Sequence, residues 1–344
     1  MDRSPEAGGV DVEPLLAVQD LRVEFQLETG RLKAVDGVSF TVLPGRVLCM
    51  VGESGSGKSV TAKALLRLIE PPGHIVAGSI RYRAVELLSL TGKDMERLRG
   101  DRISIVFQNA MTSLNPSFCV GDQVAEGLRL HRGLDRKTAR KRAIALLSEV
   151  GIPDAARRYR AYPHQFSGGM RQRILIAAAI ACQPDILIAD EPTTALDVSV
   201  QAQILRLLKR LQDERRNALL IITHDLGVVA AIADDVIVMY AGKIVERAPV
   251  TALFDRPQHP YTRGLLDAAA SRGHATARSF APIPGQPPIA IDLPAGCHFR
   301  ERCRHALPEC ATRTPVAITI APEHAVACHL AAAGQPFFAE RTVA

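Results

Sequence analysis

The sequence predicts an α/β fold in which a parallel sheet is preceded by an antiparallel β-subdomain, interrupted by a helical insert and followed by a small cysteine-rich extension. Three observations support this prediction. A glycine-rich loop joins an apolar run to a helical segment, further apolar runs alternate with helical patterns, and alternating strand patterns precede the loop. With 344 residues, 47% of them apolar and 23% charged, the chain has the composition of a globular protein of about two domains.

The N-terminal part predicts strands joined by hairpins. Residues 15–25 include an alternating pattern, and residues 38–42 alternate again before a Leu43-Pro44-Gly45-Arg46 turn. Phe25 has two interpretations, a core residue of the first strand or an aromatic plate on which adenine stacks. Physical reasoning on the sequence leaves both open.

Residues 52–59 match the phosphate-loop pattern G-x-x-x-x-G-K-[ST] at every fixed position. In this pattern glycines turn backbone N–H groups toward phosphate oxygens, the lysine places a charge near the β- and γ-phosphates, and the last hydroxyl binds Mg²⁺. Residues 47–51 predict a buried strand before the loop, and residues 60–69 predict a helix after it, stopped by Pro71-Pro72-Gly73. We therefore expect a nucleotide site formed by Gly52, Glu53, Ser54, Gly55, Ser56, Gly57, Lys58, Ser59 and Val60.

The next segments predict a further strand and a helical subdomain. Residues 103–108 form an apolar run that ends in the amide of Gln108. This side chain is either a solvated strand end or, if the following loop lies near the phosphates, a ligand contact. Helical patterns over residues 120–130 and 136–150 then predict a helical subdomain, which we place at about residues 109–180.

A second anion site is predicted at Ser167. This residue is a natural N-cap for the apolar helix over residues 174–182, and the glycines Gly168 and Gly169 leave the N-terminus of that helix bare. The backbone N–H groups and the positive end of the helix dipole can then meet an anion.

Two apolar strands end in groups that suit catalysis. Residues 186–190 end at the pair Asp190 and Glu191, which suit a Mg²⁺ ligand and a general base that orients water. Residues 218–223 precede His224, which would lie near the γ-phosphate if the strands are parallel, because ligands collect at their carboxyl ends. The alternative interpretations are an ordinary strand-end acid pair and a structural histidine.

Together these motifs resemble the ATP-binding cassette (ABC) family over about residues 14–250, the expected nucleotide-binding domain. The resemblance implies an ATPase that binds ATP and Mg²⁺. It implies Walker A at Gly52 to Ser59, adenine stacking by Phe25, a Q-loop at Gln108 that reaches Mg²⁺, the signature Ser167-Gly168-Gly169-Met170, Walker B at Asp190 and Glu191, the D-loop Ala195-Leu196-Asp197 and the switch residue His224.

Cassettes of that family pair head to tail, so one copy of each motif implies a second ABC ATPase subunit, identical or homologous. The departures from the family pattern are small. Phe166 replaces the usual leucine, Met170 the usual glutamine and Val60 a common hydroxyl residue. We expect weaker polar contact at Met170 and no loss of activity.

Residues 161–165 and 257–266 resemble the ATPase subunits of oligopeptide and dipeptide importers, with residues 251–344 as their C-terminal extension. The resemblance implies two transmembrane permease subunits, an extracytoplasmic solute-binding protein and a peripheral position on the cytoplasmic face of the membrane. Three alternatives stay open: a soluble cassette that acts on nucleic acid or ribosomes, an importer of nickel or another small solute, and an ATPase that reports the redox state of its tail.

The extension carries four of the seven cysteines, Cys297, Cys303, Cys310 and Cys328. In a cytosolic protein, clustered thiols suggest a metal before disulfides, but this spacing favours neither zinc nor iron-sulfur. The resemblance implies a 4Fe-4S cluster, with Zn²⁺ or free thiols as alternatives. Because residues 289–335 hold few large apolar side chains, we expect metal ligation to stabilise a tail that folds separately from the phosphate loop. Cys49, Cys119 and Cys182 are expected to be apolar fillers.

Composition and the N-terminus bear on location and partners. The net charge of +6 is scattered along the chain, so we expect a mildly basic surface and no nucleic-acid partner. The chain contains no run of about eighteen apolar residues, which is the length that a membrane-spanning helix needs. Residues 1–9 contain acids and a proline where a signal peptide needs an apolar core, so we expect a cytosolic protein with a flexible N-terminus over residues 1–13.

Overall fold

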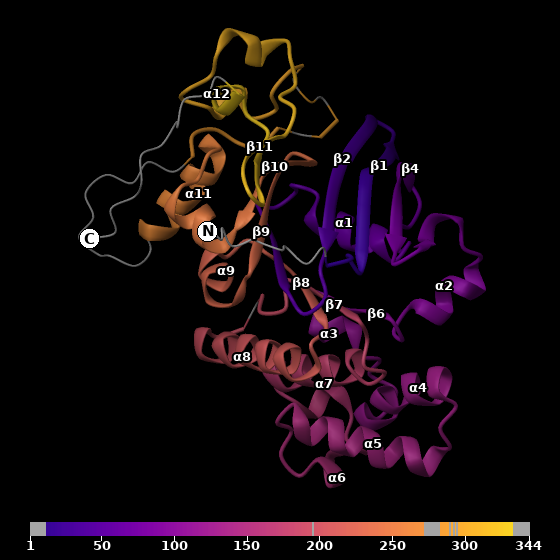
Figure 1. Cartoon of the computed structure of the whole chain (residues 1–344). Helices are drawn as coiled ribbons and strands as arrows, with labels where there is room; N and C mark the ends of the chain where they lie inside the picture. The colour runs from indigo at the N-terminus through magenta and orange to yellow at the C-terminus, as the bar shows by residue number, and fades with distance from the viewer. Residues whose placement is uncertain are drawn as a thin grey trace, which may run out of the picture.

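In the part of the chain that the structure describes, two β-sheets organise the molecule, one of eight strands and one of four (Figure 1). The strands are β1 Leu16–Leu27, β2 Gly30–Val42, β3 Val47–Val51, β4 Gly73–Tyr82, β5 Val85–Glu86, β6 Ile103–Val106, β7 Ile186–Asp190, β8 Ala218–Thr223, β9 Asp235–Tyr240, β10 Lys243–Pro249, β11 Ile318–Ala321 and β12 His324–Val326. The large sheet has the order β11-β12-β10-β9-β3-β8-β7-β6, and the small sheet has the order β2-β1-β4-β5.

Helices connect the strands and cover the large sheet (Figure 1). The α-helices are α1 Lys58–Leu65, α2 Gly92–Leu98, α3 Ala110–Ser113, α4 Val120–Arg132, α5 Arg136–Glu149, α6 Ala155–Arg158, α7 Gly168–Ala179, α8 Val198–Arg215, α9 Leu226–Ile232, α10 Val250–Asp255, α11 Pro260–Ser271 and α12 His329–Ala332. Short 3-10 helices are η1 Leu87–Ser89, η2 Pro163–Gln165, η3 Arg300–Arg302 and η4 Pro308–Ala311.

The computed structural model describes residues 12–194, 196–271, 283–288, 290, 291, 293 and 295–332. Two expectations fall outside these ranges, namely most of the flexible N-terminus and Ala195 of the predicted D-loop. Among the residues that are described, no helix combines the length and the apolar character needed to cross a membrane.

The middle of the large sheet is parallel, as predicted. Strands β9, β3, β8, β7 and β6 pair in parallel register, and every residue of β3, β7 and β8 is buried. Such strands are apolar on both faces because other layers cover both sides of the sheet. The carboxyl ends of the parallel strands meet at one edge, and that edge receives the side chains discussed below.

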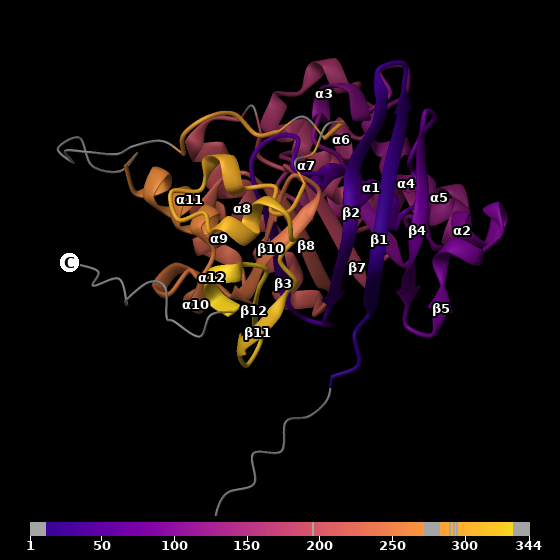
Figure 2. The ribbon, with the colours of Figure 1, turned by 90° about the horizontal axis from the view of Figure 1, so that it is seen from above.

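The small sheet confirms the predicted N-terminal hairpin. Strands β1 and β2 pair antiparallel, and β4 joins the other side of β1. A buried apolar cluster lies between this sheet, helix α1 and the large sheet, with Leu21, Met50, Leu65 and Ile188 among its members. Figure 2 shows the small sheet lying alongside α1.

Helix α1 ends earlier than predicted. The sequence pattern continued to Ile69, but the helix covers Lys58–Leu65. Arg67 has a φ of 52°, and the amide of Leu68 donates to the carbonyl of Lys63 over 2.8 Å. This is the hydrogen-bond pattern of a Schellman motif, which closes the helix before the prolines are reached.

The predicted helical insert is a group of packed helices at one end of the large sheet (Figure 1). Helices α4 and α5 begin and end close to their predicted positions. Asp135 caps α5 by accepting hydrogen bonds from the amides of Lys137 and Thr138, and Gly133 ends α4 with a φ of 61°. Both helices pack on α7, whose N-terminus is the predicted second anion site.

The cysteine-rich tail is not a separate unit, contrary to the sequence-based expectation. Strand β12 pairs antiparallel with β10, so the tail extends the large sheet of the cassette. Phe299 is 4% exposed and belongs to the main core cluster, against which Cys297 and Cys303 also pack. The tail has few large apolar residues of its own, but it does not depend on them alone, because Phe299 and its neighbours share the main core of the molecule.

Candidate active site

The phosphate loop lies between β3 and α1 and is pressed against two strands. A Cβ atom at Gly52 would lie 2.2 Å from the carbonyl oxygen of Met239, and one at Gly57 would lie 2.3 Å from that of Ala34. Both glycines have positive φ values, 154° and 102°. No larger residue fits at either position, so the glycines are required for the close approach of the loop to β9 and β2.

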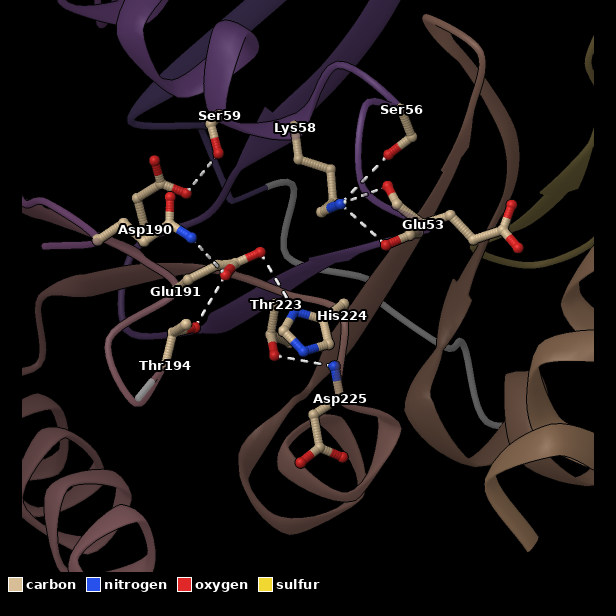
Figure 3. Close-up of polar contacts among 12 residues, drawn as sticks. Glu53, Ser56, Lys58, Ser59, Asp190, Glu191, Thr194, Thr223, His224 and Asp225 are labelled. Atoms are coloured by element: carbon tan, nitrogen blue, oxygen red, sulfur yellow. Dashed lines mark hydrogen bonds and ion pairs between the residues drawn. The ribbon is translucent and has the colours of Figure 1, made fainter. Parts of the chain in front are cut away.

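Lys58 turns back into the loop. Its Nζ donates to the carbonyl oxygens of Gly52 and Glu53 over 2.8 and 2.9 Å and lies 3.3 Å from Ser56 Oγ (Figure 3). The side chain is 4% exposed, and burial lowers its pKa, an effect that nearby carboxylates oppose, that of Glu191 most. A single buried positive charge thus lies inside the phosphate loop, where it can contact a bound polyanion.

The outer residues of the loop have different surroundings. Ser54 and Gly55 are exposed, and a side chain at Gly55 would meet no atom within 4 Å. Val60 packs against the cluster between the two sheets. The tip of the loop, at Ser54 and Gly55, is therefore open to solvent. Val60, which stands where the family often has a hydroxyl residue, makes apolar contacts instead.

Ser59 and Asp190 form the second part of the site. The hydroxyl of Ser59 donates to Asp190 Oδ1 over 2.8 Å (Figure 3). Burial raises the pKa of Asp190, and the hydrogen bond from Ser59 opposes that rise. One hydroxyl and one carboxylate are the protein ligands expected when Mg²⁺ takes its other ligands from phosphates and water, so the pair fits a Mg²⁺ site.

Glu191 contacts three side chains, those of Gln108, Thr194 and His224, and Figure 3 shows Thr194 and His224 beside its carboxylate. Its Oε2 accepts hydrogen bonds from Gln108 Nε2 and from Thr194 Oγ1, both over 2.8 Å, and its Oε1 lies 3.2 Å from His224 Nδ1. Burial would raise the pKa of Glu191, but the hydrogen bonds from Thr194 and His224 outweigh it and lower the pKa. The carboxylate is therefore ionised at neutral pH.

Strand topology explains why these residues meet. Asp190 ends β7, and Gln108, Glu191 and His224 follow the ends of β6, β7 and β8, which are adjacent and parallel. Glu191 has a φ of 47°, an uncommon value for a residue with a side chain. Strain of this kind concentrates at functional sites, where surrounding contacts maintain it.

The predicted signature segment lies elsewhere. Ser167 caps α7 as predicted, with its Oγ 3.4 Å from the amide of Met170. Within the described part of the chain, no hydrogen bond or ion pair joins this segment to the phosphate loop or to Glu191. Met170 instead contacts Arg158, whose Nη1 lies 3.6 Å from its sulfur. One chain alone therefore does not unite the two predicted anion sites.

The residues after α7 pack against its N-terminus. A Cβ atom at Gly169 would lie 2.6 Å from Val200 Cγ1, and one at Gly168 would lie 3.5 Å from Leu196 Cδ2. The described part of the D-loop, Leu196 and Asp197, thus lies beside the signature segment of the same chain.

Phe25 lies in a packing environment. A Cβ atom on Gly73 would be 2.5 Å from Phe25 Cε1 and 2.8 Å from Ile69 Cγ2, so the ring lies over Gly73 and beside Ile69. Both neighbours follow the C-terminal end of α1, whereas the phosphate loop precedes its N-terminus. These contacts match the core interpretation of Phe25, and adenine stacking remains a prediction.

The four tail cysteines lie within electrostatic reach of one another. Burial raises the pKa of Cys297 to about 11, and the thiols of Cys310, Cys328 and Cys303 add to this rise. Backbone N–H groups make hydrogen bonds to the sulfurs of Cys297, Cys303 and Cys328. Within the described ranges, however, no three His, Cys, Asp or Glu side chains are arranged to hold a metal ion.

Three contributing residues were not predicted. Thr194 lies three positions after Glu191, so a turn after the acid pair could have indicated it. Tyr261 and Arg302 reach Glu53 from the C-terminal part of the chain, and their local sequence gives no sign of this contact.

Comparison with known proteins agrees with the motifs. Residues 35–194 match the family model described as ABC transporter, and residues 245–310 match the one described as oligopeptide/dipeptide transporter, C-terminal region. A Brucella abortus (strain 2308) protein named "Putative peptide import ATP-binding protein" is 50% identical over 303 residues, which cover 88% of this chain and 91% of that protein. A similarly named protein of Brucella melitensis biotype 1 is 47% identical over 327 residues, which cover 92% and 97%.

Solved structures show the same fold. The dimeric ATP-binding cassette MJ0796, in a post-hydrolysis state bound to ADP and Pi, matches with a TM-score of 0.62 and 26% identity, covering 68% of this chain and 98% of that one. CbiO1 from Clostridium perfringens, part of the ABC transporter complex CbiONQ, matches with a TM-score of 0.60 and 27% identity, covering 70% and 91%.

A phosphate loop at the carboxyl edge of a parallel sheet, beside a small antiparallel sheet, is the architecture of an ATP-binding cassette. The chain belongs to the ABC transporter family, and it is an ATPase of that family.

Proposed function

We propose that this ATPase drives the import of dipeptides or oligopeptides through separate membrane permeases. Two features support the substrate class, the match of residues 245–310 to the C-terminal region of oligopeptide/dipeptide transporters and the names of relatives about half identical over most of the chain. The observation that carries the chemical part of the proposal is the set of contacts around Glu191.

The phosphate loop would bind the triphosphate of ATP. Lys58 already points into the loop, so an incoming phosphate would replace the carbonyl oxygens that its ammonium now contacts. Ser59, Asp190 and Gln108 would hold Mg²⁺, which supplies positive charge to the β- and γ-phosphate oxygens.

Glu191 would orient and deprotonate the attacking water. Its carboxylate is ionised, and Thr194 and His224 hold it in place from two sides. Gln108 donates to the same carboxylate, so movement of this amide toward Mg²⁺ would free an oxygen of Glu191 for water. Phe25 is kept as the candidate adenine contact.

A second cassette would complete the site. Within one chain the Ser167-Gly168-Gly169-Met170 segment is separate from the phosphate loop, and a bare helix N-terminus is suited to a phosphate held by another subunit. We propose a head-to-tail pair, two transmembrane permeases and an extracytoplasmic solute-binding protein. The chain would act as a peripheral subunit on the cytoplasmic face of the membrane.

Purification of the tagged chain from membranes tests this proposal. Two permeases and a second cassette should copurify, and in liposomes the complex should hydrolyse ATP faster when a peptide-loaded binding protein is added. Stimulation by a nickel-loaded binding protein instead would contradict the peptide assignment. Stimulation by nucleic acid or ribosomes, with no permease recovered, would contradict transport altogether.

We further propose that the four tail cysteines hold a 4Fe-4S cluster. The donor set supports this, because four thiols lie within electrostatic reach and backbone N–H groups reach the sulfurs of Cys297, Cys303 and Cys328. Hydrogen bonds to sulfur are one of the means by which proteins tune such clusters. When bound, the cluster would supply four iron–sulfur bonds that tie the tail together.

Metal analysis after anaerobic purification decides between these alternatives. About four irons per chain are expected for the cluster, whereas about one zinc would indicate a four-thiolate zinc site. Cys303→Ser should lose the iron, while Cys182→Ser, at a buried cysteine of the cassette, should keep it. Absence of metal together with a protease-resistant tail would mean that the thiols are packing residues.

A further inference from the structure

Glu53, the second residue of the phosphate loop, is held by two residues from the C-terminal part of the chain. Its backbone N–H donates to Tyr261 Oη over 2.8 Å. Its carboxylate, which points away from Lys58 (Figure 3), accepts hydrogen bonds from Arg302 Nη1 and Nη2 over 2.6 and 3.0 Å. The two residues of this ion pair are 249 positions apart.

Arg302 has few alternative partners. Its side chain is 6% exposed, its Nε donates to the carbonyl of Pro284 over 2.8 Å, and its Nη1 lies 3.4 Å from Tyr240 Oη. The planar guanidinium therefore points its two terminal nitrogens at one carboxylate, a bidentate geometry that lysine cannot reproduce. Burial of this kind makes the pair costly to break from either side.

Further contacts tie the same tail segment to the loop. Residues 296–303, here called the tail loop, carry Arg302 between two of the four clustered cysteines. His298 Nδ1 lies 3.2 Å from the carbonyl of Ala241, and the next residue, Gly242, donates its N–H to the carbonyl of Ser56 over 3.0 Å. The tail loop thus contacts the phosphate loop directly at Glu53, and it contacts Ala241, which precedes the residue that bonds to Ser56.

The charge of Glu53 makes this support important for ATP binding. ATP is a polyanion, and a carboxylate within the phosphate loop repels it unless a cation compensates. Lys58 contacts the main-chain carbonyl of Glu53, whereas Arg302 takes its carboxylate. The positive charge that compensates the Glu53 carboxylate therefore comes from the tail.

We propose that Arg302 is a positioning residue for ATP binding. It neutralises the Glu53 carboxylate and fixes the phosphate loop at Glu53. The proposal rests on the proposed role of this loop as the ATP site. It makes the tail loop part of the nucleotide site, although no nucleotide contact of Arg302 itself is required.

Steady-state ATP hydrolysis and equilibrium MgATP binding by the full chain test this role. Arg302→Gln should raise KM for ATP about tenfold and weaken binding to match, with kcat little changed. Adding Glu53→Gln should restore KM to within about threefold of wild type, because the uncompensated carboxylate is gone. Arg302→Lys, which keeps the charge but loses the bidentate geometry, should raise KM less than Arg302→Gln does. Arg304→Gln, at an exposed arginine two positions along, is the matched control and should behave as wild type.

Two results would overturn the proposal: a wild-type KM in Arg302→Gln, or a double variant as weak as Arg302→Gln alone. If Arg302→Gln does not fold, Glu53→Gln decides the question, because removing the carboxylate leaves a surplus cation beside the loop and should lower KM for ATP. An unchanged or raised KM in that variant would refute the charge argument. Lys58→Ala, measured in parallel, separates failure of the Arg302 proposal from failure of the proposed ATP site. Wild-type ATP binding by Lys58→Ala would refute the phosphate loop as the ATP site.

Discussion

Glu191 illustrates how one side chain is prepared by its neighbours. Both of its carboxylate oxygens have partners, Thr194 and Gln108 on Oε2 and His224 on Oε1. Such a carboxylate accepts little rotation, and its lowered pKa keeps it in the form that accepts a proton from water. The positive φ of 47° is maintained because β7 and the following turn are both fixed by hydrogen bonds, including that from the Glu191 amide to the carbonyl of Ile222.

Replacing this carboxylate by an amide should separate binding from chemistry. Glu191→Gln should bind ATP at near wild-type strength but turn over about a hundredfold more slowly or worse, because the amide accepts hydrogen bonds yet is no base. Single-turnover hydrolysis and equilibrium ATP binding measure the two effects. Turnover close to wild type would exclude Glu191 as the base.

At the scale of single elements, helix α7 has the open N-terminus that the proposed head-to-tail pairing requires. Ser167 caps the helix, and Gly168 and Gly169 leave its first two positions without side chains. Gly169 is also needed for packing, since any side chain there would meet Val200 at 2.6 Å. A substitution at Gly169 would therefore confound loss of the anion site with loss of packing.

Ser167→Asp is the sharper test of the signature helix. Aspartate caps helices as well as serine does, so α7 should still form, but its carboxylate would repel a phosphate presented by the partner subunit. ATP-dependent dimerisation should be lost while each monomer still binds ATP. Ser167→Asn, a neutral cap, is the control and should dimerise. Dimerisation of Ser167→Asp at wild-type strength would argue against a composite site.

At the scale of the whole molecule, a buried carboxylate joins the tail to the cassette. Glu246 on β10 is 0% exposed and accepts hydrogen bonds from the amides of Gln258 and His259, while His324 of β12 lies 2.8 Å from its Oε1. The loop before α11 and strand β12 thus share one acceptor. This junction also packs His259 against Phe299 of the tail loop, with ring centroids 5.7 Å apart.

The junction predicts that the protein loses stability in mild acid. His259 is 1% exposed, its Nδ1 accepts from the amide of Tyr261 over 3.0 Å, and burial lowers its pKa from 6.5 to about 4. Between these values the unfolded chain binds a proton that the folded chain does not, so the free energy of unfolding falls as pH drops from 6.5 toward 4. The difference between the pKa values of His259 in the unfolded and folded chain limits the loss of unfolding free energy to about 3 kcal/mol.

Chemical unfolding followed from pH 7 to 4.5 measures this dependence. His259→Asn keeps an acceptor near Nδ1 but cannot be protonated, so its unfolding free energy should fall less steeply over the same interval. His74→Asn, at an exposed histidine, should follow the wild type. Identical slopes for wild type and His259→Asn would show that His259 does not control acid stability.

Local patterns were sufficient for the elements of the cassette and for most of its candidate site. A continuous apolar run and a helix cap can both be recognised within a few residues of sequence. Strands β3, β7 and β8 and the start of α7 could therefore be predicted. Parallel strands bring their carboxyl ends to one edge, which is why residues after β6, β7 and β8 were expected together and do meet at Glu191.

Only the tertiary structure decided which segments far apart in the sequence contact one another. The packing of Phe25 on Gly73 follows from the pairing of β1 with β4, which the sequence did not indicate, while adenine stacking by this ring stays a prediction. The tail was expected to fold apart, yet β12 completes the large sheet, and Arg302 binds Glu53 across 249 positions. Pairing of an edge strand and of a buried charge depends on which surfaces are left free after the cassette folds. No pattern within a few residues carries that information, because the partner in each case is chosen by geometry and not by nearness in the chain.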